Sequence, residues 1–441
     1  MRLLLLASLL VCAGTHAATT YTVTDTGDAG DGTCDATCTL RDAVDAAQAD
    51  DRILFDLALP APIVIGLSGP ALQIDVPLRI TATDGVRTTI RRVANKGRLI
   101  DVLAGGDARV VGIGFEDGVE DTAEVHAYGG AILVHALGAL ELRDCVFRNN
   151  FANAVAPNFD AGGWRARGGA IYAAGELRVD GCAFIGNKTD SAIGSFGGYT
   201  MDPNGGPAGD SSGGAIHAEG LVDIANTTFS GNIAFAQDGG LGDTNNFDAS
   251  GGRGGDAYGG AVSLGANAVG TIAFSTMIHN TTRPGEGGLG GAFGVGPQGP
   301  PGLASGSAVA TAAATVLNTS VIAANEGAPP CAGDALLVAR TTNAVDHASC
   351  PGNVVVALDT QFDPIDALAL SPHYAPKFDS VVVDAAPDCL DAIAFEAVDL
   401  DQLLTPRPLT TYLPAGRCDI GAIEFNPVLF ADGFEEPPPP P

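Results

Sequence analysis

The chain has 441 residues, 60 of them glycine, and its 51 acidic residues outnumber its 22 lysines and arginines, giving a formal net charge of −29. This charge excludes a general affinity for nucleic acid or for anionic lipid surfaces, because both are themselves negatively charged. It leaves calcium and cationic partners open.

The first 17 residues predict a secretory signal peptide. Arg2 is followed by the apolar run Leu3–Ala13, and Thr15–Ala17 offers a cleavage site. The alternatives are a buried N-terminal strand and a lipid-modified Cys12. No later run reaches the roughly 18 apolar residues that cross a bilayer, so we expect no transmembrane segment in the mature chain. We therefore expect an extracellular or cell-surface protein.

Residues 18–60 predict an N-terminal cap. Leu40, Val44 and Ala47 share one face at helical spacing, and Thr39 precedes them as an N-cap residue. A short helix here would close the first coil of a stacked-strand protein and block edge pairing. The run Cys38–Ala43 resembles the Cys-Ser-Leu-Arg-Glu-Ala motif near the N-terminus of many secreted β-helix proteins, with Thr and Asp replacing Ser and Glu.

A basic stretch lies in the first coils of a predicted β-helix at residues 61–330. Six lysines and arginines fall between Arg79 and Arg98, and short apolar runs such as Ile63–Ile65 surround them. Elimination from a uronic acid needs a base and neutralisation of the carboxylate charge, so Arg91 and Arg92 are candidate catalytic residues. The alternative is a set of outward-facing side chains paired with nearby carboxylates.

Two short phrases recur from residue 129 onward and predict the architecture. The first, Gly-Gly-Ala-Ile or Gly-Gly-Ala-Val, begins at Gly129, Gly168, Gly213 and Gly259. The second, an apolar residue followed by two others and Asn, ends at Asn150, Asn187, Asn232, Asn280 and Asn325. Alternating runs between the phrases indicate strands with one buried face. Because one such unit cannot bury its own apolar face, neighbouring units must stack.

We therefore predict an all-β protein, a right-handed parallel β-helix with capped ends. The Asn residues are either left-handed turn residues, since Asn tolerates positive φ, or a ladder of side chains that hydrogen-bond along the axis. The predicted repeat core consists of Ile132, Phe147, Ile171, Phe184, Ile216, Phe229, Val262 and Met277.

Glycine-rich insertions separate each Asn from the next Gly-Gly. The repeat step is 37 residues from Phe147 to Phe184, 45 from there to Phe229, and 48 from there to Met277. Insertions at one register of a solenoid project from one side, so a fringe of loops is expected. The insertions are 151–167, 188–212, 233–258 and 281–306.

Two residues of the insertions are candidate ligand contacts. Trp164, the single tryptophan, either stacks on a sugar ring or packs back to anchor its loop. Asp256 lies in Gly251–Gly259, which fits a calcium-binding nonapeptide pattern. That pattern works as tandem copies and occurs here once, so calcium is a possible ligand and no other cofactor is expected.

The paired Gly-Gly-Ala-Ile and Phe-x-x-Asn phrases resemble the repeats of chlamydial polymorphic outer-membrane proteins and of many bacterial secreted right-handed parallel β-helix proteins. The resemblance covers about residues 125–330. It implies the fold and leaves the activity open, because one fold hosts many functions.

The chain end predicts a second cap and a tail. Residues 331–425, which finish in Arg417–Phe425, resemble the choice-of-anchor Q region that follows many bacterial β-helices. Residues 426–441 end in five prolines and should be extended and disordered.

Eight cysteines follow Cys12, an even number for an exported protein. Three local pairings suggest themselves as disulfides, with buried thiols as the alternative. They are Cys34–Cys38, Cys331–Cys350 and Cys389–Cys418. Cys145 and Cys182 hold equivalent places in adjacent coils, so we expect a reduced, buried stack.

No catalytic motif stands out. The histidines are scattered, and His126, His135 and His217 are expected to face solvent or cap strands. We expect a monomeric, secreted, adhesin-like protein that binds a polysaccharide, matrix or other surface ligand without catalysis. The alternatives are a polysaccharide lyase or glycoside hydrolase with its site on the N-terminal coils, and a structural envelope component.

Overall fold

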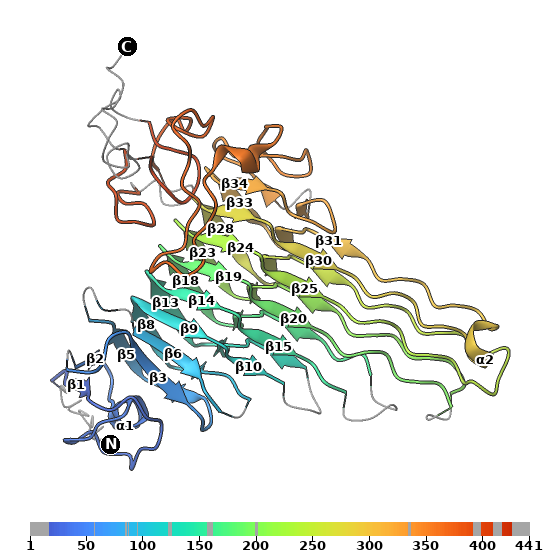
Figure 1. Cartoon of the computed structure of the whole chain (residues 1–441), viewed down its shortest axis with the longest axis horizontal. Coiled ribbons are helices and arrows are strands. Elements are labelled where there is room, and N and C mark those ends of the chain that lie inside the picture. The colour runs from blue at the N-terminus through green and yellow to red at the C-terminus, as the bar shows by residue number, and fades with distance from the viewer. Residues whose placement is uncertain are drawn as a thin grey trace, which may run out of the picture.

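A computed structural model shows a parallel β-helix from which long arms project to one side (Figure 1). The structure describes residues 17–425 except 57, 84–85, 87, 95, 122–125, 157–161, 199–201, 334–336, 391–397 and 409–416. The predicted signal peptide and proline-rich tail lie outside the described residues. In the part of the chain that is described, no helix has the length and apolarity needed to cross a membrane.

Three long parallel sheets form the body of the β-helix. Sheet A contains β1 (Thr20–Val23), β2 (Asp51–Phe55), β5 (Pro77–Thr81), β8 (Asp107–Val111), β13 (Ala139–Arg143), β18 (Glu176–Asp180), β23 (Leu221–Ala225), β28 (Val269–Ala273), β33 (Thr315–Asn318) and β36 (Leu337–Val338). Sheet B contains β3 (Ile63–Leu67), β6 (Thr88–Arg92), β9 (Ile113–Glu116), β14 (Val146–Arg148), β19 (Ala183–Ile185), β24 (Thr228–Ser230), β29 (Thr276–Ile278), β34 (Val321–Ala323), β37 (Ala344–Val345) and β38 (Asn353–Val354). Sheet C contains β4 (Leu72–Ile74), β7 (Ile100–Val102), β12 (Ile132–Val134), β17 (Ile171–Ala173), β22 (Ile216–Ala218), β27 (Val262–Leu264), β32 (Val309–Thr311) and β35 (Cys331–Ala332).

Two shorter parallel sheets carry the chain into and out of the arms. Sheet D contains β10 (Val119–Glu120), β15 (Phe151–Asn153), β20 (Lys188–Asp190), β25 (Ile233–Phe235) and β30 (Thr281–Arg283). Sheet E contains β11 (Ala127–Tyr128), β16 (Ala166–Arg167), β21 (Ser211–Ser212), β26 (Ala257–Tyr258) and β31 (Ala304–Ser305). Each repeat therefore runs through sheets C, A, B, D and E in turn. Helices occur at α1 (Leu40–Ala46), α2 (Gly291–Gly294) and η1 (Leu358–Gln361).

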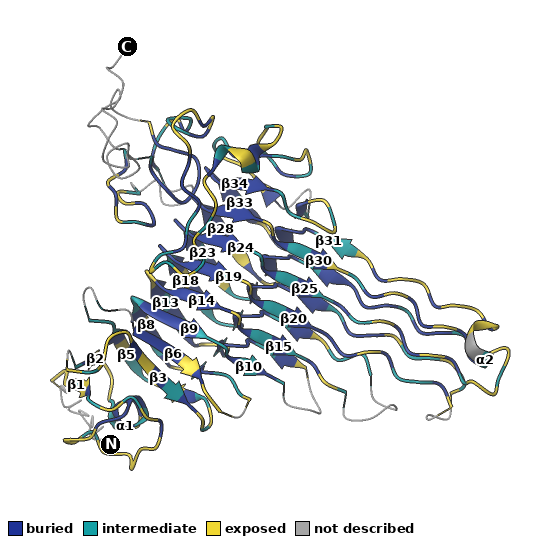
Figure 2. Cartoon of the chain, viewed as in Figure 1, coloured by how far each residue is buried: buried dark blue, intermediate teal, exposed yellow. Residues whose placement is uncertain are grey.

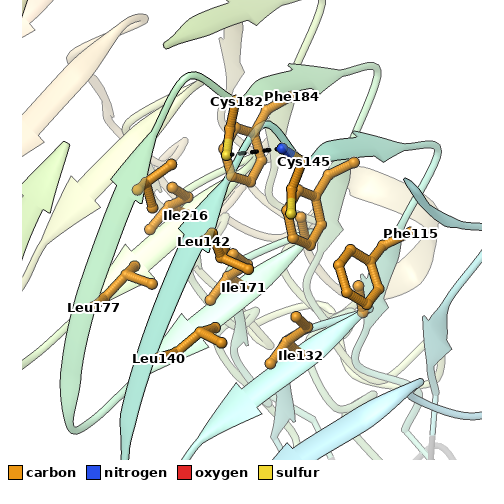
Figure 3. Close-up of a cluster of buried hydrophobic side chains, with 14 of the residues drawn as sticks. Phe115, Ile132, Leu140, Leu142, Cys145, Ile171, Leu177, Cys182, Phe184 and Ile216 are labelled. Atoms are coloured by element: carbon orange, nitrogen blue, oxygen red, sulfur yellow. Dashed lines mark hydrogen bonds between the residues drawn. The ribbon is translucent and has the colours of Figure 1, made fainter. Parts of the chain in front are cut away.

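The predicted repeat core lies in the interior as ladders of like residues (Figures 2 and 3). Phe115, Phe147, Phe184 and Phe229 are fully buried, and their rings stack at centroid distances of 4.7–5.0 Å. The register sets Phe147 beside Phe184, which places one ring above the next at the strand spacing. Ile132, Ile171, Ile216 and Val262 form the corresponding ladder of sheet C.

The cysteines pair as predicted where the spacing is local. Disulfides join Cys34 to Cys38, Cys331 to Cys350 and Cys389 to Cys418. Cys145 and Cys182 are free and buried, and the Cys145 amide donates a hydrogen bond to the Cys182 sulfur at 3.3 Å (Figure 3). Three disulfides are compatible with an oxidising, extracellular setting.

The Asn residues of the second phrase form a hydrogen-bonded ladder. Asn232 donates from Nδ2 to Phe184 O and Asn280 Oδ1, and its Oδ1 accepts from both nitrogens of Asn187, all at 2.9–3.0 Å. The left-handed residue of each turn is instead the one before the Asn, for example Gly231 at φ 65°. The Asn side chain replaces missing backbone partners at the corner, so its amide must point inward.

Replacing Asn232 with Ala should lower the free energy of unfolding by about 2–5 kcal/mol, because four hydrogen bonds are lost and their partners stay buried. Urea unfolding followed by circular dichroism measures this change. The control is Asn353→Ala, since Asn353 lies in exposed strand β38. Equal stability of the two variants would contradict a structural role for the ladder.

The arms, residues 188–212, 233–258 and 281–306, extend side by side as two layers of outgoing and returning chain (Figure 1). Beyond the short strands of sheets D and E, their backbone hydrogen bonds recur every third residue. Gly239 and Gly242 donate to Glu286 and Leu289 of the next arm at 2.9 Å. A β-strand repeats every second residue, whereas polyproline II has three residues per turn. The arms are therefore a bundle of polyproline II strands rather than irregular loops.

Glycine lines the interface between the two layers of arms. Gly285 and Gly288 donate across the layers to Gly255 and Gly252 at 3.0 and 2.9 Å. A Cβ atom built on Gly252 would overlap the carbonyl oxygen of Gly206. Since every third residue packs backbone against backbone, the arms need glycine or alanine there, and buried and exposed positions both occur along them (Figure 2).

Replacing Gly252 with Ala should open the arms while leaving the body of the β-helix folded. We expect limited proteolysis to cut within 233–258 and 281–306 at least tenfold faster than in the wild type, with little change in the melting of the body. The control is Glu286→Ala, because Glu286 is exposed on the arm surface. Unchanged protease resistance of the Gly252 variant would contradict close backbone packing.

The N-terminal helix closes the first coil. Thr39 and Asp42 form a capping box at the start of α1, and Leu40 and Val44 are buried against the core. Arg41 pairs with Asp28 at 2.7 Å. Parallel pairing then continues from β1 to β36 in sheet A and from β3 to β38 in sheet B. The boundaries near residues 60 and 330 stay predictions.

The C-terminal segment, whose described residues lie between 355 and 425, packs beside sheet B. Arg148 donates to the carbonyls of Ala367 and Ala369, and Gly421 donates to Thr319 O at 3.0 Å. Arg407, fully buried, bonds Glu424 at 3.0 Å. The segment covers the side of the solenoid as well as its last coils; its role as a cap stays a prediction.

Candidate functional site

The C/E groove is a cavity of about 430 Å³ between the outward faces of sheets C and E. Its lining includes Arg167, Ser212, His217, Glu219 and Tyr258 and reaches from β16 to β35, across five successive coils. At a strand spacing of about 4.8 Å, this length spans roughly 20 Å. The groove exists because each coil turns at a Gly-Gly corner between sheets E and C. This turn angles the arms away from the body.

Stacked rings extend the line of the groove toward the N-terminal coils. Tyr128 stacks on Tyr172 at 4.6 Å, and Tyr172 stacks on the His217 ring at 5.6 Å with an interplanar angle of 7°. Both tyrosines are half-buried. The register of sheet C places Tyr172 beside His217, whereas Tyr128 reaches Tyr172 from sheet E. Because each ring covers a face of its neighbour, the column presents ring edges to an elongated ligand.

A histidine in the groove links a hydroxyl to a carboxylate. Nδ1 of His217 lies 3.0 Å from Ser212 Oγ, and its Nε2 lies 3.1 Å from Glu219 Oε1. Arg167 donates to the same Glu219 oxygen at 3.0 Å. A Cβ atom on Gly265 would overlap the Glu219 carboxylate, so the glycine of the next coil makes room for it.

The charge states of this network follow from burial and pairing. Burial lowers the pKa of His217, and the bond to Glu219 offsets this only in part, so the imidazole is neutral at pH 7. The His217 hydrogen bond lowers the pKa of Glu219, which is therefore ionised. A carboxylate accepts only, so Nε2 carries the imidazole proton and Nδ1 accepts from Ser212.

Asp256, the calcium candidate, lies at the arm side of the groove with its oxygens occupied. Arg253 pairs with Oδ1, Leu303 N donates to Oδ1 at 2.7 Å, and the Tyr258 hydroxyl donates to Oδ2 at 2.9 Å. Burial raises the pKa of Tyr258 to about 12. Among the described residues, no group of three or more His, Cys, Asp and Glu side chains has the arrangement of a metal site. Calcium binding stays a prediction.

Arg91 and Arg92 lie away from the groove and point apart. Arg91 is half-exposed and pairs with Asp117 at 2.6 Å. Arg92 is buried, and its guanidinium donates to the carbonyls of Gly69, Gly97 and Arg98. Arg91 is thus paired with a carboxylate, whereas Arg92 is neither outward-facing nor paired with one, and a catalytic role for either stays a prediction.

Trp164 takes the second of its two predicted positions. It is half-buried at the base of the arms, packed against a cluster of alanines that includes Ala154 and Ala192. Its carbonyl accepts from Ala192 N at 2.9 Å. A role for Trp164 in sugar stacking stays a prediction.

A larger cavity of about 510 Å³ lies between the C-terminal segment and the coils. Its ionisable lining residues are Asp144 and Arg148, and Arg148 is engaged by backbone carbonyls of the segment. The cavity thus lines a packing interface, and the C/E groove has the richer chemistry.

The sequence reasoning missed His217, which is buried rather than exposed at a strand end. The signal was present in the repeat itself. Outward positions at this corner recur in every coil, and in the three coils that contain Ser212, Tyr258 and Ser305 all of them line the groove. These positions are the residue before Gly-Gly, the residue after Ile, and the one two further on. They are Tyr128, Leu133 and His135; Arg167, Tyr172 and Ala174; Ser212, His217 and Glu219; Tyr258, Ser263 and Gly265; and Ser305, Ala310 and Ala312.

Comparisons with known proteins add little to this site. No protein-family model and no curated protein sequence matches the chain. Among solved structures, the chain is similar to the pectate lyase Pel9A, with a TM-score of 0.31, 12% sequence identity, and coverage of 94% of this chain and 98% of that one. Similarity at this level carries no argument about activity. The parallel sheets themselves establish the fold.

Stability should fall more steeply with acid in the wild type than in a His217→Gln variant. In the unfolded chain the imidazole binds a proton near pH 6.5, whereas the folded pKa is lower, so stability is lost as pH falls through 6.5. Urea midpoints at pH 7.5 and 5.5 measure the difference. Parallel losses in the two proteins would contradict a neutral, buried His217.

Proposed function

We propose that the chain is a secreted glycan-binding protein that holds an extended polysaccharide along the C/E groove without cleaving its glycosidic backbone. The observation that carries the proposal is the column Tyr128–Tyr172–His217 aligned with a polar groove. The exposed edges of these rings would pack on the apolar faces of sugar rings, while Arg167, Ser212 and Glu219 offer donors and acceptors for hydroxyls. The adhesin-like role rests on this ligand class.

The length of the groove supports a polymer rather than a single sugar. It crosses five coils, and its walls are set by backbone register rather than by mobile loops. Preorganised walls reduce the entropic cost of binding. The net charge of −29 favours neutral glycans over polyanions.

Replacing Tyr172 with Ala should weaken glycan binding by about three- to tenfold, because the column loses its central ring, whose edge would contact the ligand. Retention of the purified protein on immobilised xylan, cellulose, alginate and polygalacturonate identifies the ligand, and titration gives the affinities. The control is Phe247→Ala, because Phe247 is exposed on an arm. The proposal fails if no glycan is retained or if the two variants bind alike.

The same incubations test the alternative of a polysaccharide-cleaving enzyme. New reducing or unsaturated ends, lost in an Arg91→Ala variant, would support a site on the N-terminal coils. Binding without new ends would support a binding protein.

A further inference from the structure

We propose that Ser212, His217 and Glu219 form a nucleophilic site that cleaves carboxylic esters, such as O-acyl groups on a glycan held in the C/E groove. The geometry points to this activity through one continuous chain of hydrogen bonds. Ser212 Oγ lies 3.0 Å from His217 Nδ1, and His217 Nε2 lies 3.1 Å from Glu219. The choice of a glycan ester as substrate rests on the proposed function, whereas the assignment of Ser212 as a nucleophile is independent of it.

The repeat shows that the fold does not require this combination. Five coils share the same Gly-Gly or Gly-Ser corner, and their groove-facing positions differ in every coil. One coil alone places Ser, His and Glu at the three positions, and the register sets Ser212 opposite Arg167 below and Tyr258 above. A structural need would have recurred along the stack, as the Asn ladder does.

The proton positions suit acyl transfer. Glu219 is ionised and fixes the imidazole proton on Nε2, which leaves Nδ1 as an acceptor for the Ser212 proton. Glu219 is a positioning residue, because it acts on the substrate only through the histidine. Arg167, the register partner of Ser212, donates to Glu219 at 3.0 Å and so holds the carboxylate in place.

The reaction balances with water as the co-reactant. Ser212 Oγ attacks the ester carbonyl carbon while its proton moves to His217 Nδ1. The carbonyl–alkoxide bond then breaks, and the same proton passes to the leaving alkoxide, giving an alcohol and an acyl-serine. Water attacks the acyl-serine, its proton passes through Nδ1 back to Ser212 Oγ, and a carboxylic acid leaves.

The test is covalent labelling with a fluorophosphonate probe, which reacts with activated serines and requires no glycan. We expect one adduct per wild-type chain, mapped to Ser212 by mass spectrometry, so this readout needs no variant to fold. Labelling should vanish in Ser212→Ala and fall at least about a hundredfold in His217→Ala. Ser250→Ala should label like the wild type, because Ser250 lies on an arm outside the groove, with its hydroxyl bonded to Asn204 at 2.9 Å.

The pH profile separates an acting histidine from a structural one. The labelling rate should be level above neutral pH and fall below pH 6.5 as Nδ1 becomes protonated. Glu219→Gln should move this fall to lower pH, because the carboxylate favours the protonated imidazole. No adduct on folded wild-type protein, or an adduct elsewhere than Ser212, would overturn the proposal. Glycan binding measured on the same preparation shows independently whether the groove takes its ligand.

Discussion

Hydrogen bonding between the backbones of successive coils is the constraint on which the rest of the structure depends. Each strand pairs in parallel with its equivalents one coil before and after, so every residue has a fixed vertical neighbour. Like residues then stack on like, which favours rings such as Phe147 on Phe184 and amides such as Asn187 on Asn232. Glycine is needed where the chain turns sharply: Gly213 has φ 68°, and a Cβ there would overlap the carbonyl of Ile216.

The same hydrogen bonding between the backbones of successive coils continues in the arms, without ladders of repeated side chains. As the chain leaves sheet D, lateral bonding between coils continues, but the period changes from two residues to three. The stacking also has a defined end. At the position where Gly254 donates to the next arm, the last arm has Pro301, which has no N–H to offer. Proline at this edge opposes pairing with another chain, which agrees with a monomer.

The parts of the fold that the sequence predicted are those in which side chains repeat. Gly-Gly-Ala-Ile and Phe-x-x-Asn place a glycine corner, a buried ladder and a buried amide in each coil, and the structure has all three. The polyproline II bundle was expected only as a fringe of loops. Its regular feature in the sequence is glycine at every third residue, for example Gly285, Gly288 and Gly291. This pattern lacks hydrophobic alternation and resembles the glycine-rich composition of a flexible loop. The packing of the C-terminal segment beside sheet B depends on long-range contacts, such as Ser230 with Tyr374, that no local pattern encodes.

The candidate site was harder to predict because its residues differ from coil to coil. In a solenoid, functional residues occupy the positions that do not repeat. Inward positions must keep their residue type in every coil, since each packs on its own equivalent. Outward positions of sheets C and E have no such requirement, so they are free to differ, and they meet in the groove only because the coils are in register. His217 was therefore invisible as a motif: its partners Ser212 and Glu219 lie on opposite sides of a Gly-Gly corner whose angle the sequence alone does not supply. These outward residues are found by aligning the coils with one another and setting aside the positions whose residue type is the same in every coil. Comparison among the chain's own repeats thus separates what the fold requires from what it leaves free for a ligand.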